Sequence, residues 1–420
     1  MEKMQIVITD VYDLKNNYGV QGLVLPLIDK IREKVPHAEF IMPVQSAYFN
    51  TPNIEFAGER GIRLVSYWKY SFVFELVHFF LKLGGFLREG SALSGYRALV
   101  ASIRGAGMVI DVAGIEFIGN SGLKKKWGEL LFCRMFQKLA GRYNKPYFKY
   151  TKSYGPFEGF LFSAAAKKLL GELPFIFVRG RNNLESMQKL GLKTPLHLFP
   201  DVSLVLEPAP AEWAERHLGS LGMDVSKPVT GISPSRVLSR IDSGGGANIT
   251  GRNHRELCKR MIREYSDKGL QVLVIPHAID RIDKNKCDRE LAKELLEETG
   301  HPEGVFLAGD GLSYSEARAL TGKLSYYITG RYHSVASALY MGTPVVSLAW
   351  HVKYADIMSE FLESCPVIDS RNTSIDEALG LIEKYRDDLS WFDREKVKEN
   401  KERIGREIER SIQMILESTL

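Results

Sequence analysis

Residues 324–353, LSYYITGRYHSVASALYMGTPVVSLAWHVK, predict one strand, helix, strand unit. An apolar run rich in β-forming residues covers 324–329, and a small-residue helix capped by Ser334 then runs to Gly342. Thr343 and Pro344 end this helix, and residues 345–349 read as a second buried strand. Such a unit is typical of a parallel sheet covered by helices.

Two side chains with chemistry for anions follow the first of these strands. Anions bind where a strand's carboxyl end meets a helix N-terminus, because free backbone N–H groups and the helix dipole favour negative charge there. Arg331 is permanently charged and binds carboxylate or phosphate with two donors, while His333 exchanges a proton near neutral pH. The pair therefore predicts an anion-binding and proton-transfer site.

Length and composition favour a two-domain globular protein. The chain has 420 residues, 45% of them hydrophobic and 25% charged, which is too long for one ordinary core. The formal net charge of +5 is small, and the sequence has no long basic stripe interleaved with aromatics. A nucleic-acid partner is therefore not expected, whereas an enzyme that handles anions fits.

The cysteines and the N-terminus indicate a reducing compartment. Cys133, Cys258, Cys287 and Cys365 are scattered, with no CxxC pair, so we expect free thiols rather than a zinc site. Asp and His residues do not cluster at metal spacing either, and no metal site is predicted. The first residues, MEKMQIVITD, lack an apolar run of signal-peptide length. We expect a cytoplasmic protein.

One apolar stretch has two interpretations. Residues 67–87, YWKYSFVFELVHFFLKLGGFL, contain four charged or titratable residues and are not a membrane span. A core-facing helix is the simpler interpretation. The other is a helix that lies on the inner face of the membrane or holds a lipid-linked acceptor.

The rest of the chain alternates buried strands and helices. The first half predicts strands at 5–9, 40–43, 108–112, 146–150 and 175–179, and the second adds 229–232, 271–276 and 305–307. Pro208 and Pro210 mark the best linker, and residues from Ser374 onward are helical and heavily charged. We therefore predict an α/β fold with domains at 1–207 and 208–380 and a helical extension at 381–420.

Several polar residues fall where predicted strands end. Asn17 and Gly19 follow the first strand, where glycine permits close approach of a ligand or simply forms a turn. Arg236 follows the strand at 229–232 and precedes a loop with three consecutive glycines, which either covers an anion or is merely mobile. His277 follows the strand at 271–276.

The run GRYHSVASALYMGTPVVSLAWHVKY resembles the signature of the polysaccharide pyruvyl transferase family: a glycine, a basic residue, a histidine, a small-residue helix, Gly-x-Pro, a strand and a lysine. Other stretches agree in the same order: NNYG, TKSYGPF, the Arg179 segment with Ser186, FPDVSL, GISPSR and VIPH. Together they span nearly the whole chain. Val20 departs from the pattern, because members often carry an acidic residue there.

The resemblance implies a fold and a reaction. The fold is that of GT-B glycosyltransferases, with two facing Rossmann-like domains, a cleft between them and a C-terminal helix crossing back. The reaction moves the enolpyruvyl unit of phosphoenolpyruvate onto two hydroxyls of one sugar, which forms a cyclic ketal and releases phosphate. Phosphoenolpyruvate is then a co-substrate and no cofactor is needed. The acceptor is a glycan or a lipid-linked oligosaccharide.

The resemblance also assigns roles to residues. It implies that His333 is the general acid and Arg331 an anion clamp. The remaining candidates form two groups. The donor-binding group consists of Arg236, His277, Lys353 and Ser334. The acceptor-side pair is Asn17 and Gly19.

Two other functions are compatible with such a fold. A GT-B nucleotide-sugar glycosyltransferase often uses a pair of acidic residues on a late helix to hold ribose. The helix after His333 contains no carboxylate, which favours the smaller donor. A non-catalytic glycan-binding relative is the third possibility, and the presence of both Arg331 and His333 disfavours it.

Overall fold

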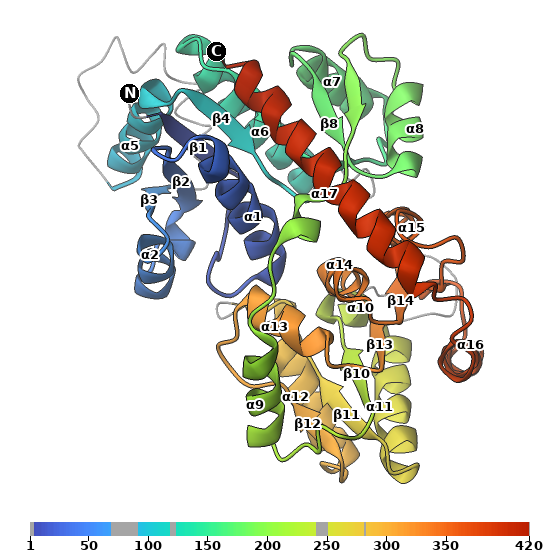
Figure 1. The fold of residues 1–420 in the computed structure, drawn as a ribbon. Helices are drawn as coiled ribbons and strands as arrows, with labels where there is room; N and C mark the ends of the chain where they lie inside the picture. The colour runs from blue at the N-terminus through green and yellow to red at the C-terminus, as the bar shows by residue number, and fades with distance from the viewer. Residues whose placement is uncertain (1–3, 69–90, 118–122, 241–250, 281–282, 420) are drawn as a thin grey trace. The chain divides into compact units, whose positions relative to one another are not determined.

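The computed structural model describes residues 4–68, 91–117, 123–240, 251–280 and 283–419, which form two compact units (Figure 1). The first unit comprises Met1–Lys15, Leu23–Val202 and Glu407–Leu420. The second unit comprises Asn16–Gly22 and Ser203–Arg406. The chain passes to the second unit at residue 203, shortly before the linker predicted at 208. Each unit is α/β with a parallel sheet, which confirms the predicted fold class.

The first unit is built on a five-stranded sheet with the order β3-β2-β1-β4-β6, all pairs parallel. Its β4 is buried along its whole length, as expected for a parallel strand covered on both faces. The elements of this unit are β1 (Gln5–Thr9), most of α1 (Tyr18–Lys34), β2 (Glu39–Gln45), η1 (Ser46–Tyr48), α2 (Thr51–Gly58), β3 (Ile62–Tyr67), α5 (Ser91–Gly105), β4 (Met108–Asp111), β5 (Ile115–Glu116), α6 (Leu123–Arg142), β6 (Tyr147–Lys149), β7 (Ser153–Tyr154), α7 (Phe160–Gly171), β8 (Ile176–Val178), α8 (Arg181–Lys189) and β9 (Leu196–Leu198).

The second unit is built on a six-stranded sheet with the order β12-β11-β10-β13-β14-β15, again all parallel. Its elements are η2 (Val202–Val205), which begins at the unit boundary, α9 (Ala211–Ser220), β10 (Val229–Ser233), α10 (Arg236–Arg240), α11 (Gly251–Asp267), β11 (Gln271–Val274), η3 (Lys284–Lys286), α12 (Asp288–Thr299), β12 (Val305–Leu307), α13 (Tyr314–Thr321), β13 (Tyr326–Thr329), α14 (Tyr332–Met341), β14 (Val345–Ala349), α15 (Lys353–Ser359), β15 (Val367–Asp369) and α16 (Ile375–Asp387).

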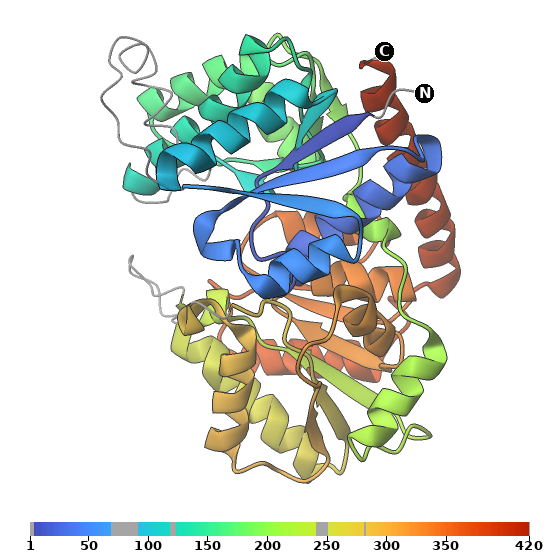
Figure 2. The ribbon, with the colours of Figure 1, turned by 90° about the vertical axis from the view of Figure 1, so that its left-hand side faces the viewer.

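Helices cover both faces of this second sheet (Figure 1 and Figure 2). Residues of α11, α12 and α16 share one apolar core with the strands, whereas α13 packs against both α9 and α14 in a separate layer. The last helix, α17 (Arg394–Glu417), belongs to the second unit up to Arg406 and to the first unit from Glu407. The predicted return of the C-terminal helix to the first domain is thereby observed.

The signature stretch folds as predicted, with one correction. β13, α14 and β14 follow in order, and Gly342 ends α14 in the left-handed conformation at φ 69°. The residue that caps the helix is Arg331, not Ser334. Ser334 lies inside the first turn and is fully buried, 3.5 Å from Ser233 through the two hydroxyl oxygens. The Ser334 hydroxyl thus faces Ser233 on β10 instead of capping the helix, which begins two residues earlier at Tyr332.

Two predicted features lie in segments that the structure does not describe. Most of the stretch 67–87 and the glycine loop at 241–250 lie outside the described residues. Within the described ranges, none of the helices combines the length and apolar character needed to cross a bilayer.

Candidate active site at the carboxyl edge of the second sheet

Three strand ends place the predicted donor-site residues at one edge of the second sheet. β10, β11 and β13 are neighbours in register, with Ile232 opposite Val274 and Ser233 opposite Thr329. The loops that follow these strands carry Arg236, His277 and the Arg331–His333 pair. Parallel strands end at the same edge, so the fold brings together residues that are far apart in sequence.

Asp288 ties these loops together. Its buried carboxylate accepts hydrogen bonds from the Arg331 guanidinium, with Nε 2.7 Å from Oδ2 and Nη2 bonded to Oδ1. It also accepts from the backbone N–H groups of Arg236 at 2.8 Å and Ala278 at 2.9 Å. Asp288 is the first residue of α12, where the helix dipole favours a carboxylate. Burial of this charge is compensated by four donors, which fix the orientation of Arg331.

Sequence reasoning missed Asp288. The pattern showed only an acidic residue at the start of a helix, which is common in surface helices. Its partners Arg331 and Arg236 lie 43 and 52 positions away, and no local signal reveals such pairing.

The guanidinium of Arg236 does not join that of Arg331. Arg236 is buried, and its side chain binds Glu294 on α12 with Nη1–Oε2 at 3.1 Å and Nη2–Oε1 at 2.5 Å. Its Nε lies 3.4 Å from the Cys287 carbonyl oxygen. The backbone of Arg236 therefore supports Arg331 through Asp288, while its charge is balanced on α12.

His333 lies in the first turn of α14 and is partly exposed. Its carbonyl oxygen accepts a hydrogen bond of 2.7 Å from the Tyr314 hydroxyl, and its ring meets the Tyr314 ring edge to face at 6.2 Å. The Tyr314 hydroxyl in turn contacts Ser337 at 3.0 Å and Arg318 at 3.1 Å. This network fixes the start of α14 and with it the imidazole.

His277 forms a second imidazole beside His333. It is 3% exposed and packs edge to face on Tyr18 at 5.4 Å and Tyr314 at 6.0 Å. Among the described residues, neither ring nitrogen has a hydrogen-bond partner. Burial lowers the pKa of His277 well below its usual value, and nearby His333 and Arg331 lower it further. At neutral pH the imidazole of His277 is therefore uncharged, and it lines the site as a polarisable ring.

Asn17 and Gly19 lie against this site in the second unit. The segment 16–22 pairs with the loop after β11 through an Asn17–Ala278 bridge, and Ile279 N–H donates to the Asn16 carbonyl at 3.2 Å. Sequence reasoning assigned Asn17 and Gly19 to the first domain. The structure corrects this placement, because the segment gains its hydrogen bonds from the second sheet's edge.

Gly19 contacts the imidazole of His333. A Cβ atom at this position would lie 3.0 Å from Nδ1 and 3.1 Å from Cε1 of His333. Asn17 stabilises the same turn, because its Oδ1 accepts from the Val20 N–H at 3.2 Å. A side chain here would therefore require His333 or Asn17 to shift, and glycine avoids this.

Lys353 is the lysine of the signature run and begins α15. Its ammonium lies over the rings of Tyr332, Trp350 and Tyr354 at 5.1–5.5 Å. The Tyr354 hydroxyl donates to the Gly330 carbonyl at 3.0 Å, which links this aromatic group to the residue before Arg331. Lys353 is thus positioned near the signature loop by packing on aromatic faces.

The first unit contains a buried group of opposite charges. Lys149 and Lys152 each bind both Asp111 and Glu116, with Lys149 Nζ 2.8 Å from Asp111 and 2.7 Å from Glu116. Burial alone would raise the pKa of Asp111, but the two ammonium groups lower it overall. With Cys133, the two carboxylates are close enough to hold a cation, yet the lysines already supply the positive charges. These residues fit an ion-pair network better than a metal centre.

The fold is shared with proteins of known structure. Anabaena Alr3699/HepE, solved in complex with UDP, matches with a TM-score of 0.59 at 9% identity, over 99% of each chain. Sucrose-phosphate synthase from Thermosynechococcus elongatus matches with a TM-score of 0.57 at 10% identity, over 99% of this chain and 98% of that one. A search of curated protein sequences finds no match.

These likenesses define the class as α/β proteins of the GT-B type. Residues 17–352 match the family described as polysaccharide pyruvyl transferase. The chain belongs to this family, which implies a transferase that acts on polysaccharide.

Proposed function

We propose that this protein moves the enolpyruvyl unit of phosphoenolpyruvate onto two hydroxyls of one sugar, in a glycan or its lipid-linked precursor. The observation that carries the proposal is the pairing of Arg331 and His333 at the N-terminus of α14, beside the neutral His277. The donor carries a carboxylate and a phosphate, which require a cation. Its methylene carbon must gain a proton, which requires an acid.

The residues have distinct roles in this proposal. His333 gives its proton to the methylene carbon, so that C2 becomes electrophilic and accepts the first sugar hydroxyl. Phosphate then leaves, and the second hydroxyl closes the ketal. Of the two protons lost by the hydroxyls, one replaces the proton that His333 gave up and the other leaves on phosphate. Arg331, oriented by Asp288, holds the anionic groups of the donor.

A nucleotide-sugar glycosyltransferase remains the alternative, and the shared fold is compatible with it. The residues of α14, YHSVASALYM, contain no carboxylate that could hold a ribose. This absence on α14 supports the smaller donor. Phosphoenolpyruvate is already activated for transfer of its enolpyruvyl unit, so the proposal includes no further cofactor. We place the reaction in the cytoplasm, or at the inner face of the membrane when the acceptor is lipid-linked.

The test is isothermal titration of the purified protein with phosphoenolpyruvate, UDP-sugars and GDP-sugars, for the parent and for Arg331→Ala. We expect phosphoenolpyruvate to bind the parent and to bind Arg331→Ala more weakly. Binding of a nucleotide sugar without binding of phosphoenolpyruvate would overturn the donor assignment. Lys268→Ala is the matched control, because it removes an exposed cation that pairs with Glu383.

A further inference from the structure

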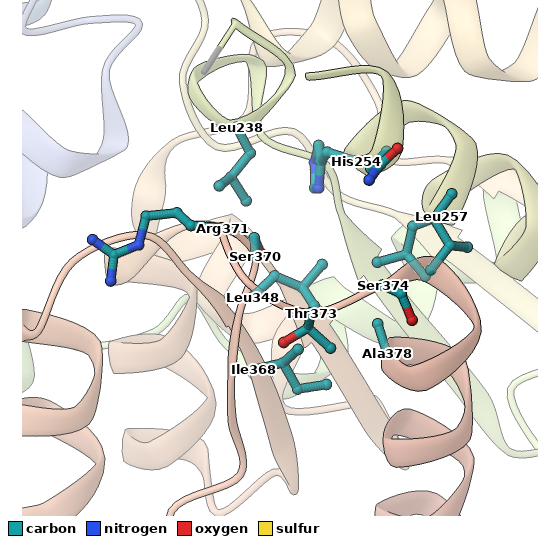
Figure 3. Close-up of a pocket in the computed structure, with 12 residues that line it drawn as sticks. Leu238, His254, Leu257, Leu348, Ile368, Ser370, Arg371, Thr373, Ser374 and Ala378 are labelled. Carbon is teal, nitrogen blue, oxygen red and sulfur yellow. The ribbon is translucent and has the colours of Figure 1, made fainter. Parts of the chain in front are cut away.

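A pocket opens on the second unit between α11 and α16, and neither predicted nor proposed chemistry uses it (Figure 3). About 460 Å³ of space lies between its walls, and this figure includes space open to solvent. Its walls are aliphatic and are formed by Leu238, Leu257, Leu348, Ile368, Ile375 and Ala378. The body of a ligand here would be apolar.

His254 gives this pocket a hydrogen-bond donor. The residue is 5% exposed, and its Nε2 accepts from the Ser235 backbone N–H at 3.0 Å. The proton of the neutral ring must therefore be on Nδ1, which has no hydrogen-bond partner among the described residues. Burial, then the charge of Arg331, lowers the pKa of His254 to about 3, so the ring is neutral at physiological pH. Figure 3 shows the ring directed from α11 towards Leu238 and Ser370.

The electrostatic environment of the pocket favours negative charge. Asn253 and His254 lie in the first turn of α11, and Ser374 caps α16, so two helices of 17 and 13 residues present their N-termini to it. Arg331 acts on His254 through its charge. The nearby Asp376 is paired with Arg260, and Asp369 is paired with Arg371, so neither carboxylate is left uncompensated.

The pocket lies on a different layer from His333. It is lined by residues of α11 and α16, which share a core with the sheet, whereas His333 belongs to α14 and contacts Tyr314 of α13. Leu238 and His254 nevertheless reach Gly330, since a Cβ there would lie 2.6 Å from Leu238 and 3.6 Å from His254. A ligand in the pocket would therefore adjoin the signature loop without occupying the His333 site.

We infer that this pocket binds a small organic anion, with a short branched aliphatic body against the leucine and isoleucine walls and one anionic oxygen accepting from His254 Nδ1–H. The anionic head is a carboxylate or a phosphate monoester, because both supply acceptor oxygens to helix N-termini. Hydroxyls of Ser370, Thr373 and Ser374 line the same pocket and provide further donors. The site does not depend on the proposed pyruvyl transfer.

The test uses the full chain with ¹⁵N-labelled histidine. The Nδ1–H signal of His254 is assigned by its loss in His254→Asn and is followed during titration with isobutyrate, isobutyl phosphate and the neutral isobutyramide. We expect at least one anion to shift the signal, and the amide not to. The two anions distinguish a carboxylate ligand from a phosphate ligand. No shift with either anion, or an equal shift with the amide, would overturn the inference.

Two further variants separate the pocket from general effects. Ala378→Leu fills the space and should weaken anion binding by about tenfold or more, while Gly380→Ala on the same helix adds a methyl group in open space and should not. Thr373→Val keeps the pocket's volume, removes one hydroxyl and should weaken binding to a smaller extent. Unchanged binding in both Ala378→Leu and Thr373→Val would place the anion elsewhere.

Discussion

Asp288 and Arg331 form a two-point ion pair in which the carboxylate is fully buried and the guanidinium side chain is 19% exposed. The same carboxylate accepts the backbone N–H groups of Arg236 and Ala278. One acidic side chain thus joins the loops after three neighbouring strands and aims the cation of the signature stretch.

Asp288→Asn is expected to destabilise the second unit by about 3 kcal/mol, because it leaves a cation with an uncharged partner and turns one acceptor into a donor. The control is Asp376→Asn, which breaks an exposed pair with Arg260 and should cost much less. Urea unfolding of both variants measures the difference. Equal losses would show that the Asp288 carboxylate does not organise the site.

Much of the fold was predictable, because parallel strands buried on both faces appear as short apolar runs between turns. The strand at 345–349 and the helix ending at Gly342 were found in this way. The predicted start of α14 was wrong, because the Ser334 hydroxyl contacts Ser233 on β10 and does not cap the helix. Local sequence patterns determine which helices and strands form, whereas tertiary contacts determine the residues at which they begin and end.

The site was only partly predictable for a related reason. Arg331 and His333 share one turn, so the sequence places them together. Asp288 joins that turn only through the sheet, and Asn17 is held by a bridge to Ala278 that no local pattern indicates. The assignment of Asn17 to the first domain failed because residues 16–22, which include the first turn of α1, pack with the second unit.

Gly19→Ala is expected to reduce transfer by about tenfold or more, because the added methyl group would lie 3.0 Å from Nδ1 of His333 and push the imidazole from its position. Alanine otherwise suits a helix, so the melting temperature should change little. Gly141→Ala in α6 is the matched control, since its added methyl group meets nothing within 4 Å. Equal activity of the Gly19 and Gly141 variants would contradict the role given to this contact.

Acid should weaken the second unit through His254. Its pKa falls from 6.5 to about 3 on folding, so folding favours the neutral ring. Above about pH 6.5 the ring is neutral in both states; as the pH falls towards 3 the unfolded state binds a proton that the folded state does not, which lowers the stability by up to about 5 kcal/mol. Denaturant unfolding at several pH values should show a smaller loss for His254→Asn than for the parent. Parallel curves for the two proteins would refute this assignment.

His333→Ala should abolish transfer while leaving phosphoenolpyruvate bound, because the variant loses the acid but keeps Arg331. We expect the rate to fall by about a hundredfold or more, the usual contribution of a positioned acid. His277→Asn is the informative comparison, because His277 is buried and held neutral, and cannot be the proton donor at neutral pH. It should retain the pH dependence of the parent even where its rate is lower. Transfer and donor binding are measured separately, by phosphate release with an acceptor glycan and by titration calorimetry. If His333→Ala transferred as fast as the parent while His277→Asn lost its pH dependence, the acid would have to be reassigned to the buried imidazole.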